Sequence, residues 1–423
     1  MIQPGRETVP QLTAETPLSA LTTMRVGGPG EQLLVAETRE ELIRIASELW
    51  RDDIPWLLLG GGSNTVVHDD GYPGAVLLVR TSGIEEIADP ELPSGQVRVR
   101  VAAGEDWDAL VATAVDRGWA GIEALSGIPG RVGAAPVQNI GAYGQELSDV
   151  LHSVEFLDAY ADAPRRLSAA ELELGYRDSV IKQGREGAVL SIDLVLTTAV
   201  VAADEPPRRG RHGAAPEAPD PSTTATSPAS GTDSGEAVPL APVRYAQLAT
   251  ALGVDVGTEI PIRVLRDAVL RLRAAKGMVL DPEDHDTWSC GSFFTNPIVT
   301  ERFARTLPAD APRFPVGGAD RQDTVIPLEA LAAGVELPLA APEREAKVKL
   351  SAAWLIDNAG VTKGFRLPGS GAAVSSKHTL AITNRGGANA AQVAELARFI
   401  VQRVQQEFGV ILVPEPNLYG LEL

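Results

Sequence analysis

Two glycine-rich stretches carry the residues best suited to holding a ligand. The first, Gly60-Gly61-Gly62-Ser63-Asn64, follows the apolar run Trp56–Leu59. Glycines directly after a strand let backbone N–H groups approach a pyrophosphate, and the serine and asparagine add side-chain donors. The GxGxxG spacing of a Rossmann fold is missing, and a short loop of this kind is more often an ordinary tight turn. The loop alone therefore leaves both interpretations open.

The second stretch runs from Ser126 to Gly144 and is far denser. It holds five glycines, two prolines and two side-chain amides in nineteen residues, without a helical or strand period. Long loops of this kind are usually functional, and their glycines let a ligand approach the backbone. A long ordered surface loop is the alternative. The positions predicted to face a ligand are Ser126, Ile128, Pro129, Gly130, Gly133, Gln138, Asn139, Gly141, Ala142, Tyr143 and Gly144.

Helices and short strands must position these loops. Thr38 and Glu41 have the spacing of a capping box at the start of a helix, and the strand predicted over 56–59 delivers the first loop. Valines alternate with arginines over 97–101, which is typical of a half-exposed strand. The pattern of 106–117 predicts an amphipathic helix. Helix and strand signals therefore alternate in this half of the chain.

The second half shows two further helices and a final strand. Pro261 opens a helix that runs to about Lys276, and Asn389 with Gln392 caps another that ends at Gly409. The residues 410–415 are predicted as a last strand that delivers a carboxylate. Four arginines of the first helix are predicted to lie away from its apolar face: Arg263, Arg266, Arg271 and Arg273. The whole pattern indicates an α+β protein.

The composition limits the function. A chain of 423 residues suits two or three domains, and a net charge of −19 argues against a nucleic-acid or anionic-membrane surface. The sequence has no apolar run of the roughly 20 residues that span a bilayer, and its first eleven residues do not resemble a signal peptide. The single cysteine, Cys290, excludes an intramolecular disulfide and fits a reducing cytoplasm. No Cys/His cluster predicts a metal site. We expect a soluble, cytoplasmic protein.

Two segments interrupt the pattern. Residues 203–242 contain no aromatic residue and almost no large aliphatic one, so they are predicted to be a disordered insertion. A docking segment for a partner is the less favoured alternative. Turn residues interrupt short apolar patches over 316–346, which indicates an additional surface excursion.

Five motifs in a fixed order resemble one known family. They are Thr23-Met24-Arg25-Val26-Gly27-Gly28, the GGGSN loop, IPGRVGAAPVQNIGAYGQE, Gly175-Tyr176-Arg177-Asp178-Ser179 and Gly291-Ser292-Phe293-Phe294-Thr295-Asn296-Pro297. Together they resemble the UDP-N-acetylenolpyruvoylglucosamine reductase family, from about Leu18 to Gly420. One departure stands near the end of the chain, where Pro416-Asn417-Leu418 follow Glu415 while many relatives continue with valine and arginine.

The resemblance implies a fold and its cofactors. The fold is α+β, with an FAD-binding domain of the vanillyl-alcohol-oxidase (PCMH) type followed by a smaller α+β substrate-binding domain. It implies a tail over 1–16, the FAD domain over 17–200, the insertion over 201–243, a tyrosine loop and helix over 244–288, and the C-terminal domain over 289–423. FAD is held non-covalently by the two glycine-rich loops. NADPH is the hydride donor, and a UDP-sugar is the substrate.

The resemblance also implies the catalytic residues. Arg177 binds and stabilises the substrate carboxylate, on which negative charge develops after hydride addition. Ser292 donates a proton to the neighbouring carbon, and Glu415 polarises the enol oxygens or assists that transfer. Without the motifs, these residues are better explained as a surface ion-pair former, a turn serine and a solvated glutamate. The residues implied to contact the substrate are Tyr176, Tyr245, Lys276 and Asn296.

Two alternatives stay open at this point. One is another FAD-dependent oxidoreductase of the same fold, and the other is a catalytically silent nucleotide-binding relative. Either should lack part of the Arg177, Ser292 and Glu415 set, and the sequence has all three. Cys290 stands two residues before Ser292 and is predicted to be a small buried residue without a role in the chemistry.

Overall fold

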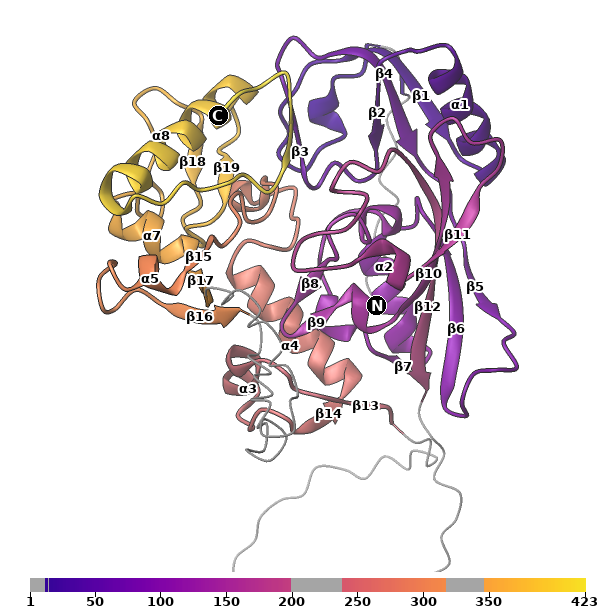
Figure 1. Cartoon of the computed structure of the whole chain (residues 1–423). Helices are drawn as coiled ribbons and strands as arrows, with labels where there is room; N and C mark the ends of the chain where they lie inside the picture. The colour runs from indigo at the N-terminus through magenta and orange to yellow at the C-terminus, as the bar shows by residue number, and fades with distance from the viewer. Residues whose placement is uncertain (1–11, 14, 199–237, 317–345) are drawn as a thin grey trace, which may run out of the picture.

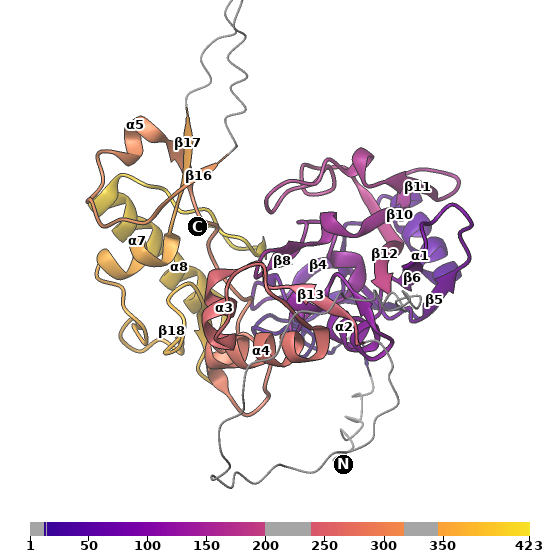
Figure 2. The ribbon, with the colours of Figure 1, turned by 90° about the horizontal axis from the view of Figure 1, so that it is seen from below.

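A computed structural model describes residues 12–13, 15–198, 238–316 and 346–423. The described residues form an N-terminal lobe over 15–198 and a C-terminal lobe over 289–316 and 346–423, which lie side by side (Figure 1). Residues 238–288 connect the two lobes and lie along one side of both (Figure 2). The predicted segments 203–242 and 316–346 lie mostly outside the described residues.

A small parallel sheet delivers the first glycine loop. Its strands lie in the order β1 (Gly30–Ala36), β4 (Tyr72–Val79) and β2 (Trp56–Leu59). The central strand β4 is buried from Gly74 to Val79, as expected for the middle strand of a covered sheet. Helix α1 (Arg39–Arg51) packs on this sheet, and its predicted capping box between Thr38 and Glu41 is confirmed. Strand β2 ends at Leu59, directly before Gly60.

A larger sheet forms the rest of the N-terminal lobe. Helix α2 (Trp107–Asp116) packs beside it, with the side chain of Asp106 accepting a hydrogen bond from the N–H of Ala109 as its N-cap. Trp107, at the start of α2, is fully buried and donates from Nε1 to the carbonyl of Leu125. The strand order is β11 (Arg165–Ser168), β10 (Leu151–Asp158), β12 (Gly187–Thr198), β6 (Gln96–Ala102) and β5 (Ile84–Ile87), with β7 (Trp119–Ala120) also paired to β12.

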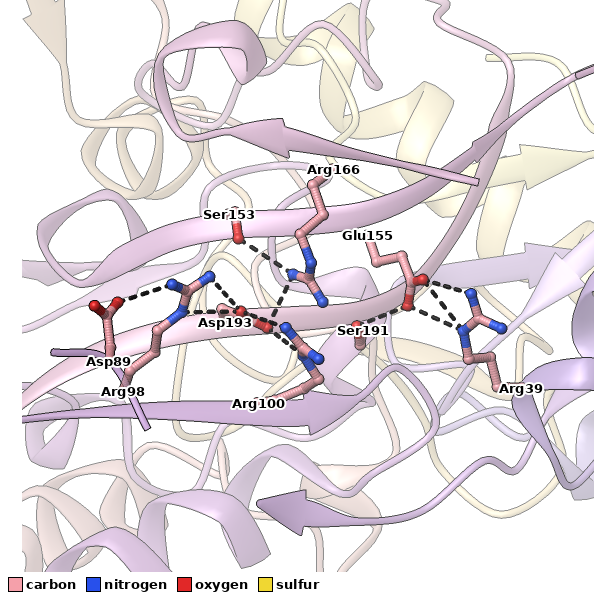
Figure 3. A network of polar contacts seen from close by, with 9 residues as sticks. All are labelled: Arg39, Asp89, Arg98, Arg100, Ser153, Glu155, Arg166, Ser191 and Asp193. Carbon is pink, nitrogen blue, oxygen red and sulfur yellow. Dashed lines mark hydrogen bonds and ion pairs between the residues drawn. The ribbon is translucent and has the colours of Figure 1, made fainter. Parts of the chain in front are cut away.

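A charged network joins the strands of this sheet (Figure 3). The carboxylate of Asp193 on β12 is fully buried and accepts contacts of 2.8–3.0 Å from Arg98, Arg100 and Arg166. Burial alone would raise the pKa of Asp193, but the hydrogen bonds from Arg100 and Arg98 hold it below its usual range. Because the arginines come from β6 and β11, one carboxylate links strands on both sides of β12.

The connecting segment corrects one predicted boundary. Its strands β13 (Leu240–Pro242) and β14 (Glu259–Pro261) pair with each other, and Ala241 in the middle of β13 is buried. The predicted disordered insertion therefore extended too far, because Leu240–Pro242 have a hydrogen-bonding partner that local composition cannot reveal. Helix α3 (Ala246–Leu252) follows, and helix α4 (Ile262–Ala275) begins after Pro261 and is capped at Lys276, as predicted.

The C-terminal lobe is built around a hydrophobic core that also includes Met24, Val26 and Val66 of the N-terminal lobe. Helix α8 (Ala390–Phe408) is its longest element, with the predicted capping box of Asn389 and Gln392 and a final Gly409 at a φ of 68°. Across the described ranges, no helix combines the length and apolar character needed to cross a membrane. The other elements are β15 (Ile298–Thr300), α5 (Glu301–Ala304), β16 (Arg313–Val316), β17 (Lys347–Leu350), α7 (Ala352–Asn358), β18 (Ala372–Val374) and β19 (Ile382–Asn384). Val316, the first residue of the predicted excursion, thus ends a strand.

The end of the chain returns to the first glycine loop. The strand predicted over 410–415 is wrong, because only Pro414 makes an isolated bridge there, to Phe294. The last strand is β20 (Asn417–Tyr419), which pairs in parallel with β3 (Thr65–Val67) directly after the GGGSN loop. This pairing places Glu415 beside the N-terminal lobe.

Candidate active site

One cavity of about 520 Å³ lies between the two lobes. This volume is within the usual range for small-molecule sites. It is lined from the N-terminal lobe, from α4 and from the C-terminal lobe, so no lobe forms it alone. The sequence-predicted residues that line it are Gly60, Gly61, Gly62, Ser63, Asn64, Ile128, Pro129, Gly130, Gly133, Gln138, Gly141, Arg177, Ser292 and Glu415.

The two glycine-rich loops touch each other along one wall of the cavity. A Cβ placed on Gly61 would lie 2.7 Å from the Cα of Gly130, and a Cβ on Gly130 would lie 2.7 Å from the Oγ of Ser63. Gly130 also has a φ of 130°, which side chains rarely adopt. The glycines are therefore required by the close packing of two loops, whose backbones both border the cavity.

Arg177 is held from behind by the second loop. Its backbone has a left-handed φ of 54°, in a turn closed by a bridge between Gly175 and Asp178. Its Nη1 donates to the carbonyl of Asn139 at 3.3 Å, and its Nη2 donates to the carbonyl of Gly141 at 2.7 Å. These contacts fix the guanidinium and leave its Nε directed toward Glu415.

Glu415 lies opposite Arg177 and is largely buried. The Arg177 Nε is 3.5 Å from the Glu415 Oε1. Burial raises the pKa of Glu415, and the positive charges of Arg177 and Lys182 only partly oppose it. The backbone is fixed on both sides, since the N–H of Glu415 donates to the carbonyl of Phe293 and the Asn64 side chain donates to the Glu415 carbonyl. The carboxyl group is thus held with an increased tendency to stay protonated.

Ser292 reaches the cavity from the C-terminal lobe. The preceding Gly291 has a φ of 74°, and a Cβ placed on it would meet nothing within 4 Å. The following Phe293 anchors the turn, because its side chain is fully buried and its N–H donates to the carbonyl of Leu380. Cys290 is buried, as predicted, and burial raises its pKa to about 12, so its thiol stays protonated at neutral pH.

Two predicted substrate residues, Tyr245 and Lys276, form a group with the predicted cofactor residue Tyr143 outside the lining of this cavity. The rings of Tyr143 and Tyr245 meet edge to face, with centroids 5.7 Å apart. The Nζ of Lys276 lies 5.6 Å above the Tyr143 ring and donates to Gln247 at 2.8 Å. Burial, aided by the charge of Arg273, lowers the pKa of Lys276. We call Tyr143, Tyr245 and Lys276 the tyrosine–lysine cluster.

Tyr176 lies in a contact between the lobes and does not line the cavity. Its ring is 40% exposed, and the Nζ of Lys349 on β17 lies 4.3 Å from the ring centroid. The guanidinium of Arg177 lies 5.6 Å from the same centroid. Tyr176 therefore packs beside the predicted carboxylate-binding arginine.

Several predicted residues support the site without lining it. The buried amide of Asn139 donates to Glu146 and to the carbonyl of Gly175, which ties the second loop to the turn of Arg177. The Asn296 side chain accepts from the N–H of Ala352 at the start of α7. Ser126 is buried and accepts a hydrogen bond from an arginine of α4. Ala142 and Gly144 also lie outside the lining, in and next to the short strand β8 (Gly141–Ala142).

Sequence reasoning did not assign two charged lining residues, Lys182 and Arg273, to the site. Lys182 borders the cavity and donates from Nζ to the carbonyl of Arg177 at 2.9 Å. Arg273 also borders the cavity, from a position outside the predicted apolar face of α4. Helical periodicity identifies the apolar face of α4, but it cannot show that a charged side chain next to that face points into a cavity.

Known proteins resemble the chain over nearly its full length. The model of the UDP-N-acetylenolpyruvoylglucosamine reductase C-terminal domain matches residues 281–419, and the model of an FAD binding domain matches residues 30–162. The UDP-N-acetylenolpyruvoylglucosamine reductase of Leifsonia xyli subsp. xyli is 53% identical over 414 residues, which cover 97% of this chain and 100% of that protein. The chain belongs to the UDP-N-acetylenolpyruvoylglucosamine reductase family.

Two further relatives support this assignment. The reductase of the same name from Thermobifida fusca is 41% identical and covers 96% of this chain and 98% of its own. The crystal structure of the Thermus caldophilus reductase has a TM-score of 0.54 at 25% identity, over 96% of this chain and 97% of that one. The predicted α+β fold, with an FAD-binding domain followed by a smaller C-terminal domain, is confirmed.

The residues of the cavity fit the FAD that this reductase family binds. Two glycine loops pack so closely that side chains at Gly61 and Gly130 would clash, which leaves their backbone at the cavity wall. Such backbone can approach a pyrophosphate, as helix and loop N–H groups do in other nucleotide sites. The Nε of Arg273 is buried without a hydrogen-bond partner among the described residues, so the protein alone does not satisfy every polar group beside the cavity.

Proposed function

We propose that this chain reduces the enolpyruvyl group of UDP-N-acetylenolpyruvoylglucosamine to give UDP-N-acetylmuramate, a precursor of peptidoglycan, with NADPH as the donor and FAD as the cofactor. The observation that carries the proposal is the convergence of Arg177, Ser292 and Glu415, from three distant parts of the sequence, on one cavity walled by both glycine loops. Family membership supports the same reaction.

The glycine loops would hold the FAD. Gly60–Asn64 and Ile128–Gly130 offer backbone N–H groups and two polar side chains at the cavity wall. Phe156 and Val189 of the large sheet add apolar contacts from another side. When bound, FAD supplies the hydride that is added to the enolpyruvyl group.

Arg177 would bind the carboxylate of the enolpyruvyl group. Addition of a hydride to the β-carbon moves negative charge into that carboxylate, so a guanidinium placed there stabilises the transition state more than the ground state. Two of its nitrogens already donate to the carbonyls of Asn139 and Gly141, which fixes its plane. The Nε that faces Glu415 is the group best placed to meet the substrate.

Ser292 and Glu415 would complete the reaction by moving a proton. The α-carbon must receive a proton after hydride addition, and Ser292 reaches the cavity on a turn whose open side has room for a substrate. Glu415 lines the same cavity, and burial raises its pKa. Its carboxyl group can therefore stay protonated and donate a hydrogen bond to the developing enolate.

The tyrosine–lysine cluster would bind the nucleotide. A lysine near two half-exposed aromatic rings suits a diphosphate and its attached sugar and base, because it supplies charge and flat apolar surface together. Asn296 and Tyr176 remain proposed substrate contacts. We also propose a cytoplasmic location, which suits the single free thiol of Cys290.

Stopped-flow spectroscopy of the purified protein tests the proposal. The protein should show flavin absorption, lose it on anaerobic addition of NADPH and recover it when the enolpyruvyl sugar nucleotide is added. In Ser292→Ala, bleaching by NADPH should proceed at close to the wild-type rate, while recovery should slow by roughly 10²–10⁴-fold. Ser292→Cys should restore part of that rate, because a thiol can also donate a proton.

The matched control is Ser168→Ala, which removes an exposed hydroxyl at the end of β11 and should change neither step. Unchanged recovery in Ser292→Ala would refute the role of Ser292 as proton donor. Loss of both steps would assign Ser292 to flavin binding instead. A wild-type protein that binds no flavin would refute the proposed function as a whole.

A further inference from the structure

Arg273 is a charged residue at the cavity for which the described residues supply no counter-ion. It lies in the last turn of α4 and borders the cavity, and its Nη2 donates to the carbonyl of Met278 at 2.9 Å. Its Nε is buried and has no hydrogen-bond partner among the described residues, where no ion pair to it is found either. Burial lowers the pKa of Arg273, but a guanidinium still keeps its charge in proteins.

Asp108, the acid whose charge acts on Arg273, already forms an ion pair with another arginine. Arg266 lies two turns earlier on α4, and its Nη1 and Nη2 contact the two oxygens of Asp108 at 2.7 and 3.0 Å. Asp108 attracts Arg273 only at longer range. A second cavity of about 30 Å³ also borders Arg273, with room for about one water, but a water supplies no counter charge. A buried cation without a counter-ion destabilises the folded protein, and the negative charge of a bound ligand would offset that cost.

The position of Arg273 identifies which anion this is. Arg177 serves the substrate carboxylate in the proposed function, and Lys276 of the tyrosine–lysine cluster serves the diphosphate. Arg273 lies beside the second glycine-rich loop, since Pro129 of that loop borders the same small cavity. A Cβ placed on Gly127, in the flavin-binding loop, would lie 3.5 Å from the Arg273 Nε. The backbone N–H groups of the two glycine loops serve the FAD pyrophosphate in the same proposal, so the negative charge of the reduced flavin ring is the one for which no cation has been assigned.

We propose that Arg273 stabilises the reduced form of the bound flavin over the oxidised form, an inference that rests on the proposed function. When FAD is bound, hydride transfer from NADPH would give the ring one N–H bond and one negative charge and would release NADP⁺. A guanidinium fixed beside the ring favours that anion by direct attraction. Charge near a flavin is one of the ways in which a protein tunes its redox chemistry.

The reduction potential of bound FAD tests the inference. It is measured by equilibrium with a reference dye in the wild type, Arg273→Lys, Arg273→Met and the control Arg263→Met. In Arg273→Met, the affinity for reduced FAD relative to oxidised FAD should fall at least tenfold, which lowers the two-electron potential by about 30 mV. Arg273→Lys should keep most of the wild-type potential. Arg263 is an exposed residue of the same helix that pairs with Asp116, so Arg263→Met should leave the potential unchanged.

A second measurement separates this role from simple packing. The melting temperature of the flavin-free Arg273→Met protein should equal or exceed that of the wild type, because the substitution removes a charge without a counter-ion. A lower melting temperature with less than a twofold change in the affinity ratio would overturn the inference in favour of a structural role. If the Met variant does not fold, Arg273→Lys decides alone: loss of the wild-type potential in this variant, which keeps the positive charge, overturns the inference equally.

Two outcomes distinguish the inference from the proposed function. An unchanged potential together with a raised Kd for the sugar nucleotide in Arg273→Met would show that Arg273 binds substrate, while the proposed reaction stands. Failure of the wild type to bind flavin or to be reduced by NADPH would refute both together.

Discussion

Replacing Gly61 by alanine tests whether the contact between the two glycine loops shapes the flavin site. Gly61 does not have a left-handed φ, so an alanine there is strained only by lack of space. Its Cβ would lie 2.7 Å from the Cα and 3.2 Å from the carbonyl carbon of Gly130, where ordinary contacts begin at 3.4 Å. The neighbour is backbone, which cannot rotate away as a side chain can. One loop must therefore move by roughly 0.7 Å relative to the other.

The displacement should weaken FAD binding. Overpacking of this kind costs about 1–3 kcal/mol, which corresponds to a rise of roughly 5- to 150-fold in the Kd if it is felt in the bound state. The Kd is measured by titrating flavin-free protein into FAD and following the flavin fluorescence. The melting temperature of the flavin-free protein should change little, since the loops can separate when no ligand holds them in place.

Two other glycines give a graded control. A Cβ on Gly387 meets nothing within 4 Å, so Gly387→Ala should bind FAD as the wild type does. A Cβ on Gly60 would lie 3.3 Å from the Cβ of Arg131, a side chain that can yield, so Gly60→Ala should give an intermediate loss. A Kd within twofold of wild type in Gly61→Ala, or an equal loss in all three variants, would refute the argument from loop contact.

Three further substitutions test the site and the fold. Lys276→Ala should raise the KM for the sugar nucleotide about tenfold while lowering kcat less, because a diphosphate contact is remote from the reacting carbons. The rate of substrate reduction should fall as the pH rises through the elevated pKa of Glu415, and Glu415→Gln should be slower and lose that dependence. Asp193→Asn should lower the free energy of unfolding in urea by about 3–5 kcal/mol, because three arginines lose their shared buried partner. Since the pKa of Asp193 is held low, this difference should be present above about pH 4 and vanish as the pH falls through that pKa.

Each of these has a contradicting result. A collapse of kcat at unchanged KM in Lys276→Ala would place that lysine at the chemistry. A pH profile that survives in Glu415→Gln would remove Glu415 from the proton step. The control for Asp193 is Glu48→Gln, which breaks an exposed pair with Arg44 and should cost about 0.5 kcal/mol or less. Equal unfolding of the two variants would show that the network contributes no more than a surface pair.

Elements with local signals were predictable from the sequence. The helices that begin after Thr38, Pro261 and Asn389 do so because capping depends on neighbours only three or four residues away. The strand β2 likewise follows from an apolar run between a proline and a glycine loop. In each case, the residues that determine the structure are adjacent in the sequence.

Elements that depend on partners far away in the sequence could not be predicted. The residues 410–413 alternate between buried and exposed as a strand does, but no neighbouring strand pairs with them. The pairing of Asn417–Tyr419 with Thr65–Val67 joins opposite ends of the chain, so no local pattern can indicate it. Ala241 was assigned to a disordered segment for the same reason, since β14 lies beyond the next helix.

At the candidate site, the sequence motifs identified the functional residues, but they could not predict which residues these side chains contact. Arg177 adopts a left-handed backbone that an arginine rarely takes, and its guanidinium donates to the carbonyls of Asn139 and Gly141. A Cβ on Gly141 would lie 3.3 Å from the Arg177 Nη1, and the Asn139 amide holds the carbonyl of Gly175 in the arginine's own turn. This part of the second loop therefore positions the arginine. Gly141 borders the flavin cavity as well, together with Ile128–Gly130 and Gly133. The loop thus both lines the cavity and holds Arg177 in place, and the second role is evident only from side-chain contacts.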